Sequence, residues 1–398
     1  MTDTLAKPIE RTWESTTIEV GRIRSALAEQ WHHWETEYPD PSVLVADSTE
    51  QVYMRASTVN VIVAVDTEDD ARWAEESLTH LSDYSPSRLL ILVRNGRPAD
   101  ATTYSVRVKV EERVHTRGVA PVRLESITII APPGNDQSLA SLSSPLLIPD
   151  LPDVLYVPYG PIADNLLVSS LFELVDILVV DTVWTKNAGA SFAVLADNST
   201  RQNVRDINDI AWSRLLVWRQ LVAQFFDQPA TLESLEAVEE VEITFAPTSE
   251  DGRCGRSAAL LTAGWLATRL GWRAPGEMVS FRDGWRSTLR AGEKGKSREI
   301  VLTLIEGEDD YNCGCLQEVR MTAGGKAAGA FDVRRTSEEE ITTTSALPDV
   351  TPVTRIVHSR CPDDRFLISQ ELRRQHEDPT YTAALDFATL LWPAGMDD

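Results

Sequence analysis

The chain has little basic charge. Its 398 residues carry 38 Lys and Arg against 61 Asp and Glu, which gives a formal net charge of −23 at pH 7. Nucleic-acid binders normally carry a basic patch or stripe, and anionic membrane surfaces attract basic segments. We therefore predict neither nucleic acid nor membrane as a partner. The excess of acid keeps a protein soluble, and it also suits a basic or polar protein partner.

Long hydrophobic runs and numerous cysteines are also missing. The longest apolar runs, such as Val61–Val65, have the length of a buried strand, far short of the roughly 20 residues of a membrane-spanning helix. Residues 1–30 contain no apolar run of signal-peptide length. Four cysteines in this length do not form the dense disulfide framework of a small secreted protein. These absences predict a cytoplasmic protein.

The first half of the chain alternates strand and helix patterns. Ile23, Leu27, Trp31 and Trp34 lie on one helical face. Runs rich in branched apolar residues indicate buried parallel strands, and other segments have helical spacing. Strands are predicted at 59–66, 88–93, 154–157 and 177–181, and helices at 69–81 and 163–174. Segments 107–112 and 124–130 have an extended or mixed pattern, and their periodicity does not decide between strand and helix. This alternation predicts an open, mostly parallel α/β sheet.

The second half has short alternating segments separated by turns, which is typical of an antiparallel sheet with one solvated face. Strands are predicted at 242–246, 299–304, 315–321, 330–333 and 340–344, and helices at 257–270, 363–375 and 380–391. At about 150 residues per domain, the length suggests two or three domains. We predict a helical arm at 1–49, an α/β domain at 50–228 and a smaller α+β domain at 229–398.

Residues 206–226 predict one long helix with Asp206 as its N-cap. Its two apolar stripes cover more than the single stripe of a surface helix. The helix either is wedged between the sheet and a second domain or presents part of its surface to a partner protein. Because Trp and Arg dominate binding hot spots, the candidate partner-binding residues are Trp212, Arg214, Trp218 and Arg219.

The sequence contains few of the residue patterns that carry chemistry. The segment 252–257 opens a predicted helix, but Glu250 and Arg256 occupy the positions of the first Gly and the Lys of a phosphate-binding loop. Neither G-x-G-x-x-G nor G-x-S-x-G occurs, and no histidines have metal-ligand spacing. Asp66 and Asp181 end predicted strands, where α/β enzymes often place functional acids. Two acids in an acidic chain do not define a site, so we predict no catalytic residue, cofactor or metal.

The cysteines leave three interpretations open. Cys313 and Cys315 flank one glycine beside the acidic segment 306–310, and Cys361 precedes a predicted helix next to Arg360. Carboxylates raise the pKa of a thiol, whereas an arginine and a helix N-terminus lower it. The thiols are inert, or Cys361 attacks Cys313 or Cys315 in a redox switch, or a metal binds with the help of Cys254 or a histidine.

Several segments carry a resemblance to a known family. They are Arg55–Asn60, Leu147–Asp153, Asp181, Asp209–Leu215, Trp218–Arg219, Ala223–Asp227 and Ala259–Trp272. In this order they resemble the glucose-6-phosphate dehydrogenase assembly protein family (OpcA), and the resemblance spans roughly residues 55–275. The order of Trp, Arg and Phe in the two Trp-rich helices is its specific part.

The resemblance implies a non-catalytic protein that binds glucose-6-phosphate dehydrogenase and promotes its active oligomer in the oxidative pentose phosphate pathway. The alternative is a nucleotide- or sugar-phosphate-binding α/β enzyme. A third possibility is a scaffold that binds its partner without changing the partner's kinetics.

Overall fold

The structure is a computed structural model that describes residues 9–37, 57–81, 87–98, 101–113, 122–185, 187–201, 206–249, 252, 254–282, 284–292, 297–308, 311, 315–374 and 376–393. Their contacts divide the chain into two compact units. Unit 1 comprises residues 1–180, 203–207 and 368–375, and unit 2 comprises residues 181–202, 208–367 and 376–398. These units do not coincide with the domains predicted at 1–49, 50–228 and 229–398.

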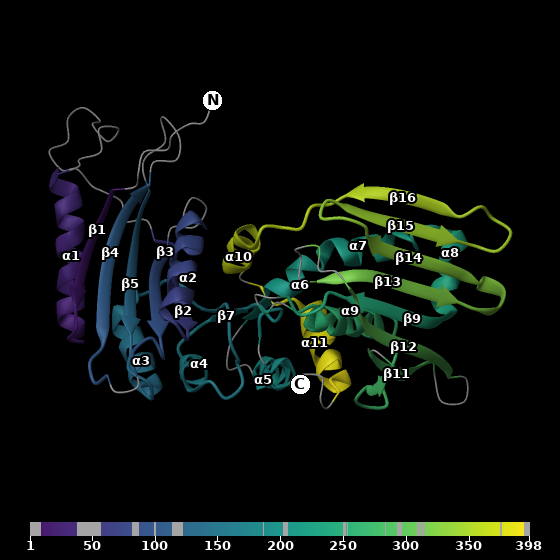
Figure 1. Ribbon diagram of the computed structural model, residues 1–398, viewed down its shortest axis with the longest axis horizontal. Coiled ribbons are helices and arrows are strands. Elements are labelled where there is room, and N and C mark those ends of the chain that lie inside the picture. The colour runs from purple at the N-terminus through teal and green to yellow at the C-terminus, as the bar shows by residue number, and fades with distance from the viewer. Residues whose placement is uncertain are drawn as a thin grey trace, which may run out of the picture. The chain divides into compact units, whose positions relative to one another are not determined.

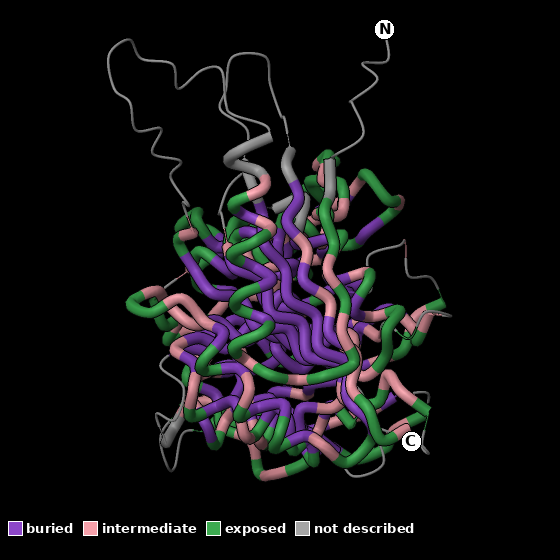
Figure 2. The backbone as a smooth tube through the Cα atoms, turned by 90° about the vertical axis from the view of Figure 1, so that its left-hand side faces the viewer, coloured by how far each residue is buried: buried purple, intermediate pink, exposed green. Residues whose placement is uncertain are grey.

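Unit 1 is built on an eight-stranded sheet (Figure 1). In spatial order its strands are β1 (Ile9–Ser15), β4 (Ser105–Arg113), β5 (Val122–Ile130), β3 (Ser87–Val93), β2 (Val59–Val65), β6 (Asp153–Val157), β7 (Ile177–Val180) and β8 (Asp206–Asp209). The pairs from β5 through β7 are parallel, and β1 and β4 add an antiparallel edge. The central strands are buried along their whole length, as Figure 2 shows in purple.

Helices α1 (Val20–Glu37) and α2 (Glu68–Leu81) cover opposite faces of this sheet. Trp31 of α1 donates from Nε1 to Glu125 at 2.7 Å, whereas Glu75 of α2 accepts from the adjacent Ser126 at 2.8 Å. Consecutive strand residues point to opposite faces, so the two helices lie on different sides. Unit 1 also contains α3 (Asp136–Ser143) and α4 (Leu166–Leu171).

Numbered in chain order from β2, the strands β2, β3, β5, β6, β7 and β8 occupy the spatial order 3-2-1-4-5-6. Open sheets of this order bind dinucleotides where the strand order reverses, which here is the carboxyl end of β2 and β6. This place is the first one to inspect for a ligand site.

Unit 2 is built on a second eight-stranded sheet, in which every pair of neighbouring strands except β12–β9 is antiparallel. In spatial order its strands are β10 (Val279–Phe281), β11 (Gly284–Ala291), β12 (Arg298–Glu306), β9 (Val238–Phe245), β13 (Leu316–Ala323), β14 (Gly329–Arg335), β15 (Glu340–Ala346) and β16 (Val353–His358). The predicted class, a mostly parallel sheet followed by a mostly antiparallel one, is confirmed.

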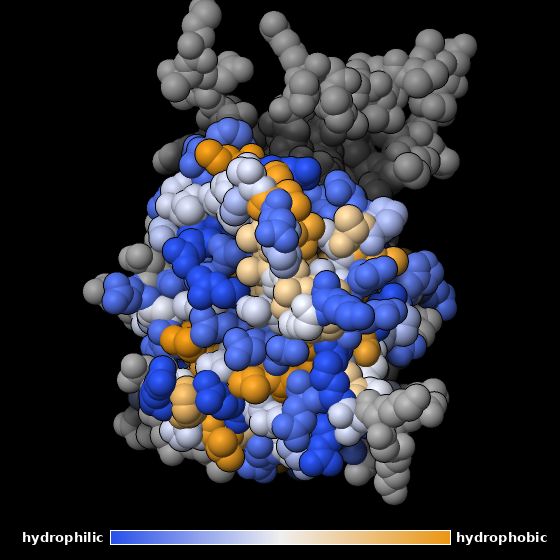
Figure 3. Space-filling model, turned by 90° about the vertical axis from the view of Figure 1, so that its right-hand side faces the viewer, coloured by the Kyte–Doolittle hydropathy of each residue, from blue (hydrophilic) through white to orange (hydrophobic). Residues whose placement is uncertain are grey.

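The helices of unit 2 are α5 (Ala188–Arg201), α6 (Ile210–Arg214), α7 (Leu216–Gln224), α8 (Pro229–Glu236), α9 (Arg256–Arg269) and α11 (Pro379–Leu391), while α10 (Asp364–Arg373) spans the division between units. Phe225 and Phe226, which follow α7, pack on Phe331 of β14. Figure 3 views the right-hand side of Figure 1 and shows hydrophobic groups interspersed with hydrophilic ones. Among the described residues, no helix has the length and apolar character needed to cross a bilayer.

The single helix predicted at 206–226 is wrong. Residues 206–209 form β8, Asp209 caps α6 by accepting from the Ala211 amide at 2.9 Å, and α7 begins at Leu216. Asp206 is a strand residue and not an N-cap. The domain boundary predicted between residues 228 and 229 falls at the start of α8, which is followed by β9. The sequence patterns also missed β1, α3, α5, β10, β11 and β16.

Candidate functional site

The loop after β2 forms the candidate ligand site of unit 1, and it is acidic. Asp66 and Thr67 lead into α2, whose first turn carries Glu68, Asp69 and Asp70. Thr67 donates from Oγ1 to Asp70 at 2.6 Å, and the Asp70 amide donates to Thr67 Oγ1 at 3.1 Å. The helix N-terminus is thus satisfied by its own side chains. Four carboxylates stand where a dinucleotide would place its pyrophosphate, and they repel an anion.

Asp66, one of the acids singled out in the sequence, is part of an ion-pair network in this loop region. Arg94 follows β3 and places Nε 3.3 Å from Asp66 Oδ1 and 3.9 Å from Asp136 Oδ1. On α2, Trp73 packs against Tyr159 with ring centroids 5.0 Å apart. Arg94 is therefore engaged by carboxylates, and a phosphate would have to compete with them for it.

A surface groove of unit 1 between α3 and α4 offers no better phosphate site. Its cavity has a volume of about 700 Å³. The lining consists of Gln137, Ala140, Ser141, Ser144, Leu166, Ser169, Ser170, Glu173 and Leu174. Glu173 is the ionisable side chain in this set, so the groove provides no cation for a sugar phosphate.

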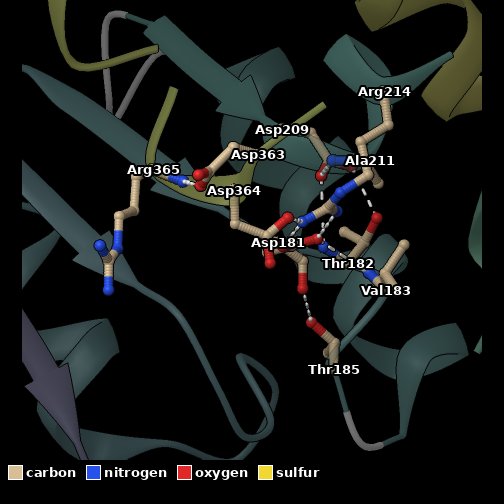
Figure 4. A network of polar contacts seen from close by, with 10 residues as sticks. All are labelled: Asp181, Thr182, Val183, Thr185, Asp209, Ala211, Arg214, Asp363, Asp364 and Arg365. Carbon is tan, nitrogen blue, oxygen red and sulfur yellow. Dashed lines mark hydrogen bonds and ion pairs between the residues drawn. The ribbon is translucent and has the colours of Figure 1, made fainter. Parts of the chain in front are cut away.

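A buried polar cluster of unit 2 surrounds Arg214 (Figure 4). Arg214 binds Asp181 in a bidentate pair, with Nη1–Oδ1 at 2.7 Å and Nη2–Oδ2 at 2.6 Å. Its Nη2 also donates to Asp364 Oδ1 at 2.7 Å. Asp209 accepts from Thr182 Oγ1 at 2.7 Å and from two backbone amides. The cluster thus joins the residue after β7, the start of α6 and the start of α10.

Burial decides what this cluster can do. The three central side chains of the cluster are almost fully buried: Asp181 is 4% exposed, Asp209 2% and Arg214 7%. A substrate therefore does not reach them without unfolding their surroundings. Burial and the nearby Asp181 raise the pKa of Asp209 to about 7. Burial also raises the pKa of Asp181, and the Arg214 guanidinium opposes this shift. The cluster holds the fold of unit 2 together and is not an open catalytic site.

The four predicted partner-binding residues are mostly inside unit 2. Trp212, Arg214 and Trp218 are buried, and Trp212 donates from Nε1 to Asp378 at 2.9 Å. Arg219 is half-buried, with its guanidinium carbon 3.5 Å from the centre of the Trp212 ring. Buried side chains cannot touch a partner surface. We therefore assign Trp212, Arg214 and Trp218 a structural role, and Arg219 a role in covering Trp212.

The cysteines separate into distinct classes. Cys361 is disulfide-bonded, whereas Cys254 and Cys315 are free. Burial raises the pKa of Cys315 to about 11, which makes it a poor thiolate and speaks against its predicted redox role. Cys313 lies outside the described residues. Within the described ranges, no group of three or more His, Cys, Asp or Glu side chains has the arrangement of a metal site.

Sequence reasoning found Asp181 and Arg214 but did not pair them, and it missed Asp364 and Tyr381. The Tyr381 hydroxyl lies 3.4 Å from Asp209 Oδ2. The partners of Arg214 are 33 and 150 residues away in the sequence. A buried arginine between apolar neighbours signals a need for carboxylate partners, but it does not tell which ones.

Comparison with known proteins places both units in one family. Residues 78–197 match the model described as the glucose-6-phosphate dehydrogenase subunit N-terminal domain. Residues 205–385 match the corresponding C-terminal domain. The two ranges cover most of the chain.

Curated relatives and one solved structure are also similar. The OxPP cycle protein OpcA of Synechococcus elongatus is 28% identical over 42% of this chain and 35% of its own length. The protein of the same name from Synechocystis is 27% identical over 34% of this chain and 27% of its own length. The matched segment thus spans about a third of the relatives. The transcriptional regulator Gal80p from Kluyveromyces lactis aligns over 84% of this chain and 87% of its own, with a TM-score of 0.41 and 10% identity.

Proposed function

Because this chain belongs to the OpcA family of glucose-6-phosphate dehydrogenase assembly proteins, we propose that it is a non-catalytic factor that binds this dehydrogenase and favours its active oligomer. Its place would be the oxidative pentose phosphate pathway, in the cytoplasm.

The observation that carries the non-catalytic part is the loop after β2. The sheet of unit 1 has the strand order of a dinucleotide-binding fold, but the loop that should hold the pyrophosphate carries Asp66, Glu68, Asp69 and Asp70 in place of glycines. A glycine-rich turn lets the backbone approach the phosphates, and this loop offers side-chain carboxylates instead. The fold is retained while its usual ligand is disfavoured.

An activator of this kind works by differential binding. It must bind the active oligomer of the dehydrogenase more tightly than the inactive form, and the shift between them cannot exceed that difference in affinity. Activation should therefore saturate as the protein is added.

The test is a titration of this protein into purified glucose-6-phosphate dehydrogenase at limiting substrate. We expect dehydrogenase activity to rise to a plateau, with a matching change in oligomer mass by light scattering. The protein alone should turn over no glucose 6-phosphate with NADP⁺ or NAD⁺. Unchanged kinetics with measurable binding would indicate a scaffold, and unchanged kinetics without binding would refute the proposal.

The alternative, a nucleotide- or sugar-phosphate-binding enzyme, is favoured by the strand order alone. A thermal-shift screen distinguishes the two, because a ligand at 100 times its Kd stabilises a protein by about 2.7 kcal/mol. We expect no shift with nucleotides or sugar phosphates. A saturable shift that Asp66→Gly changes would favour the enzyme.

We also propose that the thiol chemistry of Cys361 tunes binding to the dehydrogenase. Cys361 is half-buried and disulfide-bonded, and the neighbouring Arg360 is ion-paired with Glu339. A reducing cytosol keeps such bonds transient, so the bond would act as a switch.

A further inference from the structure

The sheet of unit 2 has one face that its own helices cover and one that they leave open. Along β9, Val241, Ile243 and Phe245 are buried, while Glu240, Glu242 and Thr244 between them are exposed or half-exposed. The buried side packs against α7 and α9. The described helices of unit 2 therefore lie on one side, and we call the other side the outer face.

The strand register gives the composition of the outer face. One row across seven strands reads Arg286, Thr303, Glu242, Arg320, Asp332, Thr344, Thr354. The next row reads Gly284, Ile305, Thr244, Glu318, Arg334, Thr342, Ile356. Threonine, arginine and aliphatic residues dominate, and lysine is absent from both rows. Protein interfaces are likewise enriched in arginine and depleted in lysine.

A charged cluster lies at the centre of these rows. Arg320 contacts Glu242 at 3.5 Å, Asp332 at 3.8 Å and also Glu318, and Arg334 contacts Glu318 at 2.8 Å. The cluster contains three carboxylates and two guanidinium groups, so its net charge is −1 when all five groups are ionised, one positive charge short of neutrality. The neighbouring strands β12 and β15 present Thr303, Thr342 and Thr344, which add no charge, and Arg286 of β11 lies beyond Thr303, to whose Oγ1 it donates from Nε at 3.4 Å.

Asp332 is the most weakly paired carboxylate of this cluster, since its Oδ1 lies 3.8 Å from Arg320 Nε and accepts no hydrogen bond from any described residue. This oxygen is buried, but the side chain as a whole is 23% exposed, so an approaching group can reach it. Burial and the hydrogen bond with Glu318 raise the pKa of Asp332 to about 7, against the opposing effect of Arg320 and Arg334. At neutral pH this carboxyl is thus only partly ionised.

The size of the outer face is that of a protein interface. Seven strands about 4.8 Å apart span roughly 29 Å, and strands of seven residues run roughly 23 Å. The resulting area of roughly 670 Å² lies within the range of roughly 600 to 1,000 Å² that one partner contributes to a standard interface.

We propose that glucose-6-phosphate dehydrogenase docks on this outer face and presents an arginine or lysine to Asp332. The inference rests on the proposed function and names its surface. A basic side chain there supplies the missing positive charge of the cluster, and the threonine and isoleucine side chains around it add uncharged contact area.

A proton-linked affinity follows from this contact. The basic side chain lowers the pKa of Asp332 in the complex, so the complex forms with the ionised carboxylate. Affinity should rise with pH up to the free value near 7, by at most tenfold per pH unit for one proton. Above pH 7 it should be constant.

The experiment measures the Kd of the full-length protein for the dehydrogenase by calorimetry at several pH values from 6 to 8. Thr342→Arg/Thr344→Arg adds bulk and positive charge beside Asp332, and we expect at least a tenfold weaker Kd at pH 7.5. Asp332→Asn should weaken binding and remove its dependence on pH. Gln220→Arg is the matched control, because Gln220 is exposed on α7, on the covered side of the sheet. Unchanged melting temperatures verify that each variant is folded.

The outcomes separate this inference from the proposed function. If the wild type binds and Thr342→Arg/Thr344→Arg binds equally well, the outer face is the wrong surface and the proposed function stands. If that variant instead breaks a homodimer while dehydrogenase binding persists, the face contacts a second copy and our inference is overturned. If the wild type does not bind, the proposed function fails, and the docking inference fails with it.

Discussion

At the scale of single residues, Asp209 shows how burial converts a carboxylate into a pH-sensitive group. It accepts hydrogen bonds from Thr182 and from the amide of Ala211, yet its pKa is raised from 3.8 to about 7 because it is buried beside Asp181. A raised pKa in the folded state favours the protonated form. The stability it contributes is present at low pH and is lost as pH rises from the unfolded value through 7.

We therefore expect the free energy of unfolding to fall by up to about 1.4 kcal/mol per pH unit from pH 5.5 to 7 through this group, and then to level off. Asp209→Asn keeps a neutral side chain at all pH values and should remove this slope. Urea denaturation at each pH measures it. The exposed Asp227→Asn serves as the control and should keep the wild-type slope; a slope unchanged in Asp209→Asn would show that another group titrates.

The cysteines provide a second prediction at this scale. With a pKa of about 11, roughly one thousandth of Cys315 is thiolate at pH 8, so iodoacetamide should not label it in the native protein. Cys361 should be labelled only after reduction, because it is disulfide-bonded. Mass spectrometry of alkylated peptides tests both statements.

For the redox proposal, oxidised and reduced protein should differ in affinity for the dehydrogenase, and Cys361→Ser should bind equally well with and without reductant. Equal affinity of the oxidised and reduced wild type would contradict the redox proposal and would mean that the disulfide of Cys361 has only a structural role.

At the scale of elements, long buried patterns were predictable from the sequence and short ones were not. Strands β2, β3, β6 and β7 have runs of apolar residues typical of buried parallel strands, and helices α2 and α11 have clear periodicity. Helix α9 is buried nearly all round, so its length and not its periodicity identifies it. Residues 206–226 misled the prediction because β8 has only four residues and carries Asp206 and Asp209. The extended conformation of β8 depends on pairing with the neighbouring strand, and the spacing of apolar residues in the sequence gives no information about such pairing.

The crossing of α9 and α11 tests element packing. A Cβ on Gly264 would lie 2.2 Å from the carbonyl oxygen of Ala384, closer than real Cβ contacts. Gly264→Ala should therefore destabilise the protein by about 1–3 kcal/mol, although alanine favours a helix by about 1 kcal/mol over glycine.

Gly324→Ala is the control, because the three atoms nearest to its Cβ would belong to the movable end of the Glu239 side chain. Thermal unfolding of the two variants compares them. Equal melting temperatures of the two variants would mean that α9 and α11 can move apart without a loss of stability, and that their close approach does not require glycine at position 264.

At the scale of the whole molecule, the two sheet types followed from the spacing of apolar residues, whereas the grouping of elements into units did not. Unit 1 includes residues 203–207 and 368–375 from distant parts of the sequence. The composition of these two segments does not show that the chain returns to unit 1 there. Three of the four residues predicted to bind a partner, Trp212, Arg214 and Trp218, lie in the interior, and the reason that the sequence did not show this is related. Trp and Arg are enriched both in interfaces and in polar cores, and only the three-dimensional contacts of Arg214 and Trp212 distinguish the two.

The net charge of −23 should control how fast this protein finds its partner. The rows of the outer face carry nearly balanced charge, so attraction at long range comes from the rest of the surface and acts on encounter more than on the bound complex. Raising the salt from 0.1 to 1 M shortens the Debye length from about 10 to 3 Å. Surface plasmon resonance should show the association rate with glucose-6-phosphate dehydrogenase falling about tenfold or more, while the dissociation rate changes much less. Association that is independent of salt would mean that the partner presents no basic field, and it would remove the reason for expecting a basic side chain opposite Asp332.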